Sequence, residues 1–464
     1  MSKRKLVEDT SPAPFKRAKE LANVALTESQ KEVLRLAREG RSFFFSGAAG
    51  SGKSFILKII AEDLKNTYGE SNVYVTASTG IAASAIGGTT LHSFAGLGLA
   101  TESAEELTDK LLHTSKPHVT KTRKRWQKAN VLIIDECSMI DSDFFTKLDH
   151  VARHVRSAAA RTDAGIINCK TKPFGGMQVI MCGDFFQLPP VDKTGKVDKP
   201  MLFETPVWRA LIGTNIVVLK EIIRQKDPRL IKLLTDLRYG KLSKDSLDLL
   251  EQRRDASADF SSMPKDTVRL FPTRAEAESV NRLNLQNLDP SSEHVYHAVD
   301  RGDQFQIEKL KDQWSAPKEL VVRKGATVMF IFNVSIEKGV VNGTTGKVIG
   351  FFGPEQHPVV EHSAGVEVAT PQLWEVKLGK EVVASRQQVP LILAYAITTH
   401  KSQGMSIKNV EVNTDRIFEH GQTYVAFSRA TSLEGLFVNG KMPRQELLNP
   451  DPRVINWWAL INLK

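Results

Sequence analysis

The sequence predicts an α/β protein with two domains built on parallel sheets and a small β insertion in the second domain. Short, nearly continuous apolar runs end in an acid at VLIID (131–135) and QVIMCGD (178–184), as buried parallel strands do. Strand-like and helical segments alternate from residue 26 onward, which indicates a sheet covered by helices. The alternation returns at VRLFPTR (268–274) and therefore predicts a second α/β domain.

The first domain begins with clearly alternating elements. Residues 28–39 (ESQKEVLRLARE) predict an amphipathic helix that Thr27 caps. A short apolar run at 42–45 leads into a glycine-rich loop, and residues 53–64 predict the helix that follows. Residues 73–78 (VYVTAS) then predict a strand.

Two stretches of the first domain interrupt this alternation. Residues 101–128 are polar and then strongly basic (KTRKRWQK), which predicts an insertion in the domain. Residues 155–176 have no clear hydrophobic period, so they predict a long surface insertion.

The second α/β domain is divided by a segment of different character. PLILAYAI (390–397) predicts one of its strands, whereas residues 287–386 are strand-like and rich in turns. Asn342-Gly343 is a strong turn signal within that segment. The predicted domains are 26–220 with an insertion near 96–128, 221–286 joined to 387–464, and the β insertion 287–386.

Composition and charge narrow the class of protein. The chain has 464 residues, with 41% hydrophobic and 25% charged, which is typical of globular proteins. No run approaches the ~20 apolar residues that a membrane span needs. The three cysteines lack CxxC spacing, so we expect free thiols, a reducing compartment and no zinc site. A net charge of +10 favours a polyanionic partner, although solubility alone could explain it.

Residues 1–25 are predicted to form a basic, disordered tail. Lys3–Lys5 and Lys16–Lys19 have the spacing of a bipartite nuclear-import signal. Such clusters also bind nucleic acid without sequence specificity. The alternative is a solvated tail that carries no targeting signal. Glu8 and Asp9 argue mildly against a mitochondrial presequence, so the nucleus is the expected location and the mitochondrion the alternative.

The glycine-rich loop predicts a nucleotide site. It reads GAAGSGKS and matches the pattern GxxxxGK[ST], with an apolar run before it and a predicted helix after it. Glycines let backbone N–H groups face phosphates, and the helix N-terminus favours negative charge. We expect Lys53 to reach the β- and γ-phosphates and the Ser54 hydroxyl to hold Mg²⁺. The predicted loop residues are Gly47, Ala48, Ala49, Gly50, Ser51, Gly52, Lys53 and Ser54.

Polar residues at strand ends predict hydrolysis at this site. Asp135 can hold Mg²⁺, and Glu136 beside it can orient and deprotonate the attacking water. Gln187, in GDFFQLPP, could sense the γ-phosphate or be an ordinary polar loop residue. Gln30 on the first helix could read adenine. The sequence has no NKxD guanine-reading motif, so ATP is the expected nucleotide.

The chain resembles the Pif-one (petite integration frequency) family of DNA helicases, which are relatives of RecD in superfamily one, B-type. The resemblance runs from about Leu26 to about Val438 and rests on the ordered blocks GAAGSGKS, ASTGIAASAIGGTTLHSFAG, LIIDECSMI, CGDFFQLPPV, LKEIIRQ, HKSQGMSI and TYVAFSRA. It implies two RecA-like domains with ATP between them, an inserted wedge, and an SH3-like β insertion. It also implies that single-stranded DNA lies across both domains and that the protein moves along this strand in the 5′ to 3′ direction.

The resemblance implies roles for further residues. Arg224 and Arg429 match positions that reach the γ-phosphate from the second domain, and Gly404 matches a backbone that faces it. Gln30 matches the adenine-reading glutamine. The residues implied to contact the DNA backbone are Thr79, Gly80, His92, Ser93, Thr399, His400 and Lys401.

Other interpretations stay open for several side chains. His92 and His400 could be buried histidines, and Phe94 could stack on a base, although core packing is favoured for it. The basic residues that could brace duplex DNA or form a solvated face are Lys121, Arg123, Lys124 and Arg125.

The expected function is that of a 5′-to-3′ DNA helicase that depends on ATP and Mg²⁺. A DNA clamp that uses ATP only to reset its grip, and the motor subunit of a larger nuclease or transposition machine, are the alternatives. The resemblance implies roles in DNA replication, repair, recombination and telomere upkeep. The expected partners are single-stranded DNA, its junctions with duplex DNA and G-quadruplex DNA, with a monomer off DNA.

Overall fold

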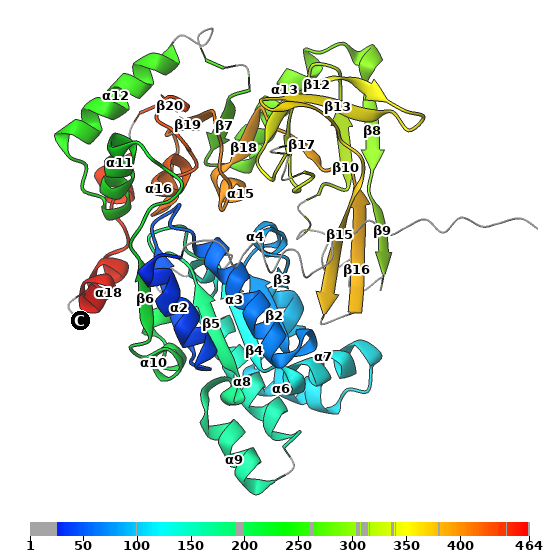
Figure 1. Cartoon of the computed structure of the whole chain (residues 1–464), viewed down its shortest axis with the longest axis vertical. Coiled ribbons are helices and arrows are strands. Elements are labelled where there is room, and N and C mark those ends of the chain that lie inside the picture. The colour runs from blue at the N-terminus through cyan, green and yellow to red at the C-terminus, as the bar shows by residue number, and fades with distance from the viewer. Residues whose placement is uncertain are drawn as a thin grey trace, which may run out of the picture.

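The computed structural model describes residues 26–464 except 99, 161, 191–198, 259–262, 265, 303–306, 308–313, 315, 336–337, 339, 379–380, 442 and 463–464. The predicted basic tail lies outside the described residues. Among the helices that are described, none combines the length and the apolar character needed to cross a membrane. Figure 1 shows a lower domain, an upper domain and a β-rich module beside the upper one.

The lower, first domain is built on a six-stranded parallel sheet in the order β3-β2-β4-β5-β1-β6. Its strands are β1 (Phe43–Gly47), β2 (Val73–Ala77), β3 (Thr89–Thr90), β4 (Val131–Asp135), β5 (Gln178–Cys182) and β6 (Ile216–Leu219). Every residue of β1, β2, β4 and β5 is buried, which is why these segments are nearly continuous apolar runs. The predicted strands of this domain are confirmed.

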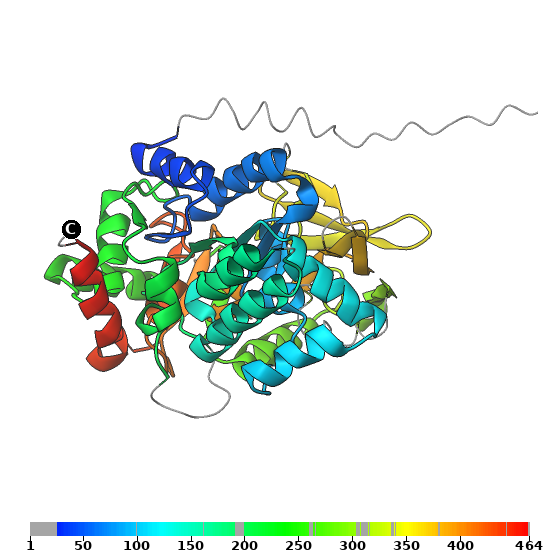
Figure 2. The same ribbon diagram turned by 90° about the horizontal axis from the view of Figure 1, so that it is seen from below.

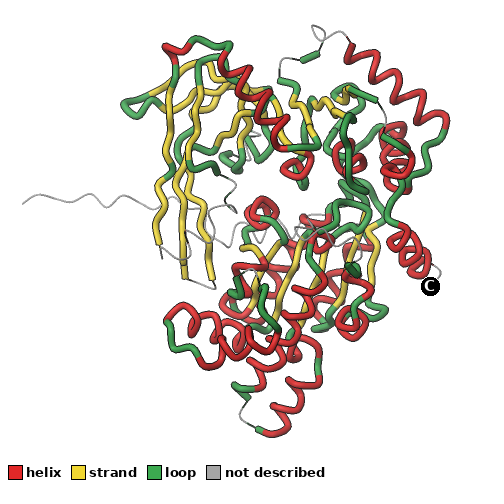
Figure 3. The backbone as a smooth tube through the Cα atoms, turned by 180° about the vertical axis from the view of Figure 1, so that it is seen from behind, coloured by secondary structure: helices red, strands yellow, loops and turns green. Residues whose placement is uncertain are grey.

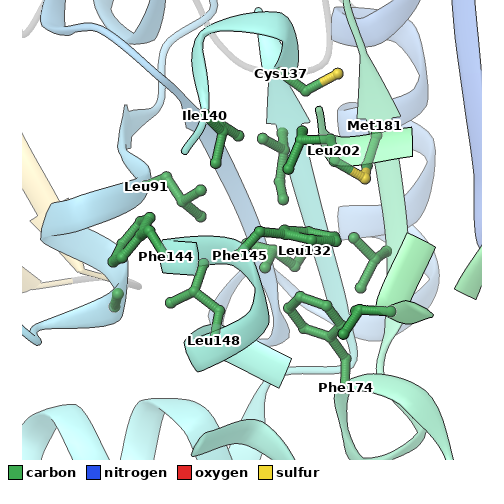
Figure 4. Close-up of a cluster of buried hydrophobic side chains, with 14 of the residues drawn as sticks. Leu91, Leu132, Cys137, Ile140, Phe144, Phe145, Leu148, Phe174, Met181 and Leu202 are labelled. Carbon is green, nitrogen blue, oxygen red and sulfur yellow. The ribbon is translucent and has the colours of Figure 1, made fainter. Parts of the chain in front are cut away.

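Helices cover both faces of this sheet. Val131 and Ile133 face a cluster with α2 (Glu28–Arg38) and α3 (Lys53–Tyr68), whereas Leu132 and Ile134 face the opposite cluster. Figure 4 shows Phe145 and Leu148 of α8 (Ser142–Ser157) packed over Leu132 on that second face. Burial of each such side chain contributes roughly 1.5–3 kcal/mol to stability. Because successive side chains of a strand point to opposite faces, this burial holds one layer of helices on each face of the sheet.

Helix α2 forms where the sequence predicts it. Thr27 caps it in a capping box: its hydroxyl accepts from the backbone N of Gln30 at 3.3 Å, and Gln30 Oε1 accepts from the Thr27 N at 3.1 Å. Val33, Leu36 and Ala37 form its buried stripe.

The basic stretch after β3 is a packed helical layer. Helix α4 (Gly80–Ala85) precedes β3, and α5 (Leu91–Ala95), α6 (Ala104–His113) and α7 (Pro117–Lys128) follow it. Trp126 is fully buried and donates to the Ala95 carbonyl at 3.0 Å. Phe94 is also fully buried, 4.8 Å from the Trp126 ring, so it belongs to the core. Arg125 is buried too, and donates to the Ser93 carbonyl at 3.2 Å, so neither a duplex brace nor a solvated face describes it.

The stretch 155–176, for which the sequence predicts a long surface insertion without a clear hydrophobic period, is helical. Helix α8 continues to Ser157, α9 (Asp163–Thr171) follows, and a 3-10 turn (Pro173–Gly176) leads into β5. Phe174 is fully buried, and its backbone N donates to Asp149 Oδ1 at 2.6 Å. Val155 and Phe174, near the two ends of the stretch, are both fully buried, and so wide a spacing produces no repeating pattern.

The upper, second domain is built on a four-stranded parallel sheet in the order β18-β7-β19-β20. Its strands are β7 (Val268–Phe271), β18 (Ala396–Thr398), β19 (Val410–Asn413) and β20 (Leu436–Asn439). Its helices are α11 (Pro228–Tyr239), α12 (Lys244–Ala258), α13 (Arg274–Gln286), α15 (Thr399–Ser402), α16 (Gln422–Phe427) and α17 (Gln445–Leu448). The predicted second α/β domain is confirmed.

The β module is antiparallel. One sheet has the order β14-β13-β12-β11-β17, another β15-β16-β9, and β8 pairs with β10. The strands are β8 (His294–His297), β9 (Val299–Gly302), β10 (Glu319–Val322), β11 (Thr327–Phe330), β12 (Thr345–Phe352), β13 (His357–His362), β14 (Gly365–Val368), β15 (Gln372–Leu378), β16 (Glu381–Gln388) and β17 (Leu391–Leu393). Figure 3 shows the β15–β16–β9 ribbon extending from the upper part of the molecule toward the first domain.

The apolar run 390–397 contributes strands to two sheets rather than to one. Leu393 of β17 pairs with Val328 in the module, whereas Ala396 of β18 pairs with Arg269 in the second domain. The module therefore extends beyond its predicted end at 386. An unbroken apolar run does not show where its strand changes sheets.

The predicted second domain also ends too late, because α18 (Pro452–Asn462) packs on the first domain. Figures 1 and 2 show this helix beside the first domain. The Trp457 ring stacks on Phe203 at 4.5 Å and lies 5.2 Å from Phe185. Trp458 meets Phe186 edge-on at 5.4 Å. The first domain also includes α10 (Pro206–Leu211), whose Trp208 lies 6.1 Å from Trp457.

Removing the Trp457 ring is expected to destabilise the first domain. We expect Trp457→Ala to lower the free energy of unfolding by roughly 2–4 kcal/mol, because the ring is half-buried among aromatic side chains. Urea unfolding followed by tryptophan fluorescence and circular dichroism would measure the change. Leu460→Ala, on the same helix but 64% exposed, is the matched control. Equal effects of the two substitutions would contradict the packing role.

Candidate nucleotide site and DNA path

The glycine-rich loop lies between β1 and α3, where its sequence predicts a phosphate cradle. Gly50 has φ 85°, and a Cβ there would lie 2.7 Å from both Arg224 Cβ and Gln225 Oε1. Only glycine fits this position, because the backbone is left-handed and the segment 224–225 touches the loop. The Gly50 carbonyl also accepts from the backbone N of Ile223 at 2.8 Å.

Lys53 and Ser54 occupy the first turn of α3 and connect the loop to β4. Lys53 Nζ donates to the carbonyls of Gly47 at 2.8 Å and Ala48 at 3.1 Å. Ser54 Oγ donates to Asp135 Oδ2 at 3.2 Å. The predicted metal ligands thus lie together, and a hydroxyl and a carboxylate are the hard oxygen donors that suit Mg²⁺.

Glu136 is placed by an unusual backbone. It has φ 50°, rare for a residue with a side chain, and its N–H donates to Asp135 Oδ1 at 2.8 Å. Burial, and next the charge of Asp135, raise the pKa of Glu136 to about 7, while Lys53 and Arg429 act in the opposite direction. A carboxylate that titrates near neutrality suits a general base.

The two predicted arginines converge on Ser428. Arg224 Nη1 donates to the Ser428 carbonyl at 3.2 Å, and Arg429 Nη2 donates to its hydroxyl at 2.8 Å. Burial, and then Arg224, lower the pKa of Arg429 to about 9. Two neighbouring guanidiniums beside a phosphate cradle suit a polyanion such as a triphosphate.

The remaining predicted nucleotide residues lie around the same loop. A Cβ at Gly52 would lie 3.0 Å from Gln30 Nε2, so the buried Gln30 amide faces the loop. Gln187 is buried in the loop after β5, and its backbone N donates to the Asp184 carbonyl at 2.9 Å. Gly404 has φ 80°, and a Cβ there would meet open space.

Sequence patterns missed the contacts that join the two domains at this site. Tyr424 Oη accepts from the Ala49 N–H of the loop at 2.7 Å. Asp184 and Arg238 form a buried pair with N–O distances of 2.9 and 3.1 Å. Arg238 also lies over the Phe186 ring, 4.3 Å from its centre. Tyr424 and Asp184 belong to motif blocks, but a block does not indicate which residue its side chains contact.

The predicted DNA contacts of the first domain lie on α4 and α5, which follow β2 and β3. Thr79 and Gly80 are half-buried, and Thr79 Oγ1 accepts from the Ala82 N–H at 3.2 Å. His92 is half-buried, and its ring stacks on Phe144 at 4.2 Å. Ser93 is buried, and its N–H donates to Thr90 Oγ1 at 3.2 Å.

Their counterparts in the second domain form α15, which Figure 1 places toward the first domain. Thr399 is buried and donates to the Phe271 carbonyl at 3.4 Å. His400 Nε2 lies 3.3 Å from a Glu419 carboxylate oxygen. Lys401 borders a cavity of about 390 Å³ together with Arg274, and desolvation followed by Arg274 lowers the pKa of Lys401. Of these three, Lys401 is the best placed to meet a phosphate.

Comparisons with known proteins agree with this geometry. The model of the PIF1-like helicase family matches residues 25–246, and that of the DNA helicase Pif1 2B domain matches 307–351. The chain is 39% identical to the ATP-dependent DNA helicase PIF1 of Xenopus laevis, over 97% of this chain and 67% of that protein. The chain therefore spans about two thirds of the length of that relative.

Solved structures of Pif1 helicases are similar over most of this chain. The Pif1 helicase of Candida albicans superposes with a TM-score of 0.73 at 35% identity, covering 95% of this chain and 100% of that one. The Bacteroides Pif1 helicase in complex with ADP-AlF3 and single-stranded DNA superposes with a TM-score of 0.66 at 29% identity. That match covers 95% of this chain and 98% of the Bacteroides chain.

Proposed function

The chain belongs to the PIF1-like family of ATP-dependent DNA helicases, and we propose that it moves 5′ to 3′ on single-stranded DNA and unwinds duplexes ahead of it. The supporting observation is one nucleotide site assembled from both domains. Lys53, Asp135 and Glu136 come from the first domain, whereas Arg429 comes from the second. Such a division lets ATP binding draw the two domains together.

The chemistry of each side chain follows from its position. Ser54 and Asp135 would hold Mg²⁺, which neutralises charge on the phosphates when bound. Lys53 would exchange its contacts with the Gly47 and Ala48 carbonyls for phosphate oxygens. Glu136 would orient the attacking water and accept its proton, while Arg224 and Arg429 stabilise the charge that develops on the γ-phosphoryl group.

Movement on DNA would use two regions that contact the DNA backbone whatever its base sequence, here called grips. The α4–α5 region of the first domain and α15 of the second offer hydroxyls, N–H groups and Lys401 to phosphates. If ATP binding and hydrolysis change the distance between the grips, the strand advances. The two grips rest on family resemblance and on the placement of these helices.

Finer assignments follow the family. We infer that the substrates include junctions of single-stranded and duplex DNA and G-quadruplex DNA, in replication, repair, recombination and telomere upkeep. We also infer a monomer off DNA and a nuclear location directed by Lys3–Lys5 and Lys16–Lys19.

The experiment is unwinding of two partial duplexes, one with a 5′ single-stranded tail and one with a 3′ tail. With ATP and Mg²⁺ we expect only the 5′-tailed duplex to open. Opening of the 3′-tailed duplex alone would overturn the polarity. DNA-stimulated ATP hydrolysis without opening of either duplex would favour the clamp, or a motor that needs a partner chain.

A further inference from the structure

Gln403 connects the second domain directly to Glu136. Its Nε2 donates to Glu136 Oε2 at 3.1 Å, and both side chains are buried. The two residues are 267 positions apart in the chain. The Gln403 amide oxygen is also buried and has no hydrogen-bond partner among the described residues. It is therefore available to accept a hydrogen bond from a water molecule next to the carboxylate.

The backbone around Gln403 belongs to α15. Gln403 is the C-cap residue of this helix, and its N–H donates to the His400 carbonyl at 3.3 Å. His400 and Lys401 are two of the predicted DNA contacts. A DNA phosphate that displaces this short helix must also displace the Gln403 side chain.

The same turn positions an arginine of the nucleotide site. Arg429 Nη1 donates to the carbonyls of Ser402 at 3.2 Å and Met405 at 3.3 Å, which flank Gln403. The water-orienting carboxylate and the arginine are thus both attached to one short segment of backbone. The next residue, Gly404, has φ 80°, a conformation that lets the chain turn sharply after it.

We propose that Gln403 is a positioning residue that aligns the Glu136 carboxylate for water activation and relays DNA binding at α15 to ATP hydrolysis. The proposal rests on the proposed function, because it requires a DNA-stimulated ATPase. A glutamate side chain rotates freely about its last bond, and a fixed amide donor selects one orientation. Misplacement of a catalytic group by even ~1 Å costs about 10²-fold in rate, so control of this orientation can control turnover.

The test replaces Gln403 with methionine, which keeps the length of the side chain and removes the amide. ATP turnover is measured with and without oligo-dT, together with the KM for ATP and the Kd for fluorescent oligo-dT. We expect Gln403→Met to lower DNA-stimulated kcat about tenfold, a part of the roughly 10²–10⁴-fold that general-base catalysis supplies. The KM for ATP and the Kd for oligo-dT are expected to stay within about twofold.

Gln388→Met is the matched control. Gln388 is also a buried glutamine, in β16, and its Nε2 donates to the carbonyls of Tyr296 at 3.0 Å and Pro317 at 3.2 Å. We expect this variant to keep the stimulation factor of the wild type. Thermal unfolding of both variants separates loss of turnover from loss of folded protein.

Three outcomes would overturn the proposal. If Gln403→Met keeps the full stimulation factor, the contact with Glu136 has no catalytic role. If the Kd for oligo-dT rises by the same factor as kcat falls, Gln403 acts on DNA binding instead. If the wild type itself shows no stimulation by DNA, the proposed function fails together with the relay, which distinguishes that failure from the first two.

Discussion

Lys53→Ala is expected to lower kcat for ATP hydrolysis by roughly 10³-fold and to abolish unwinding. The ammonium lies at the start of α3 and already contacts two loop carbonyls, so it can follow the phosphates through the reaction. Loss of one charge positioned at the phosphates removes stabilisation that forms mainly in the transition state. The proposed DNA contacts lie on other elements, so the affinity for single-stranded DNA should stay within about twofold.

Steady-state ATP turnover and fluorescence anisotropy of an oligonucleotide would measure the two quantities. Lys65→Ala is the control, because Lys65 is on the same helix and its Nζ lies 3.8 Å from Glu62, outside the loop. Undiminished turnover in Lys53→Ala would remove the loop from the catalytic site. A parallel loss in Lys65→Ala would point to damage to the helix instead.

Arg224→Ala is expected to lower kcat by roughly 10³–10⁵-fold with little effect on folding. A guanidinium at the γ-phosphate contributes about that factor in comparable enzymes. Arg224 is half-buried, and in the described structure a single hydrogen bond, to Ser428, is recorded for its side chain. Its guanidinium can therefore turn toward a phosphate without loss of other contacts.

The comparison with Arg429 makes this prediction sharper. Arg429 donates to the carbonyls of Val425, Ser402 and Met405 within its own domain. Arg429→Ala should therefore reduce turnover and also lower the free energy of unfolding by at least about 2 kcal/mol, because buried acceptors lose their donor. Arg253→Ala, on α12 and bonded to the Leu436 carbonyl at 2.7 Å, is the control for turnover. Equal turnover in Arg224→Ala and Arg253→Ala would exclude Arg224 from catalysis.

The strands that hold the nucleotide site were predictable because they are buried on both faces. VLIID could be identified as β4, and its position places Asp135 and Glu136 at the carboxyl end of the sheet. Ser54 and Asp135 were both predicted as Mg²⁺ ligands, and Ser54 Oγ lies 3.2 Å from Asp135 Oδ2. These features depend on local sequence and on rules that hold for parallel sheets.

Contacts between the domains could not be predicted in the same way. The Asp184–Arg238 pair and the Tyr424–Ala49 bond join segments that no periodicity relates. The helices within 155–176 could not be predicted, because Val155 and Phe174 are buried too far apart in the sequence to produce a repeating pattern. Trp457 and Trp458 pack on the first domain, and nothing in their sequence indicates which domain they cover.

The position of α18 has a consequence for how the chain matures on the ribosome. The last strand of the first domain ends at Leu219, and α18 is translated about 230 residues later. At ~5–20 residues per second, the nascent first domain waits roughly 10–50 s with Phe44, Phe203 and Trp208 without their partner Trp457. Completion of the ATP-binding domain therefore awaits synthesis of the second domain. A premature stop codon just before α18 would therefore destabilise the first domain, although that domain is synthesised first.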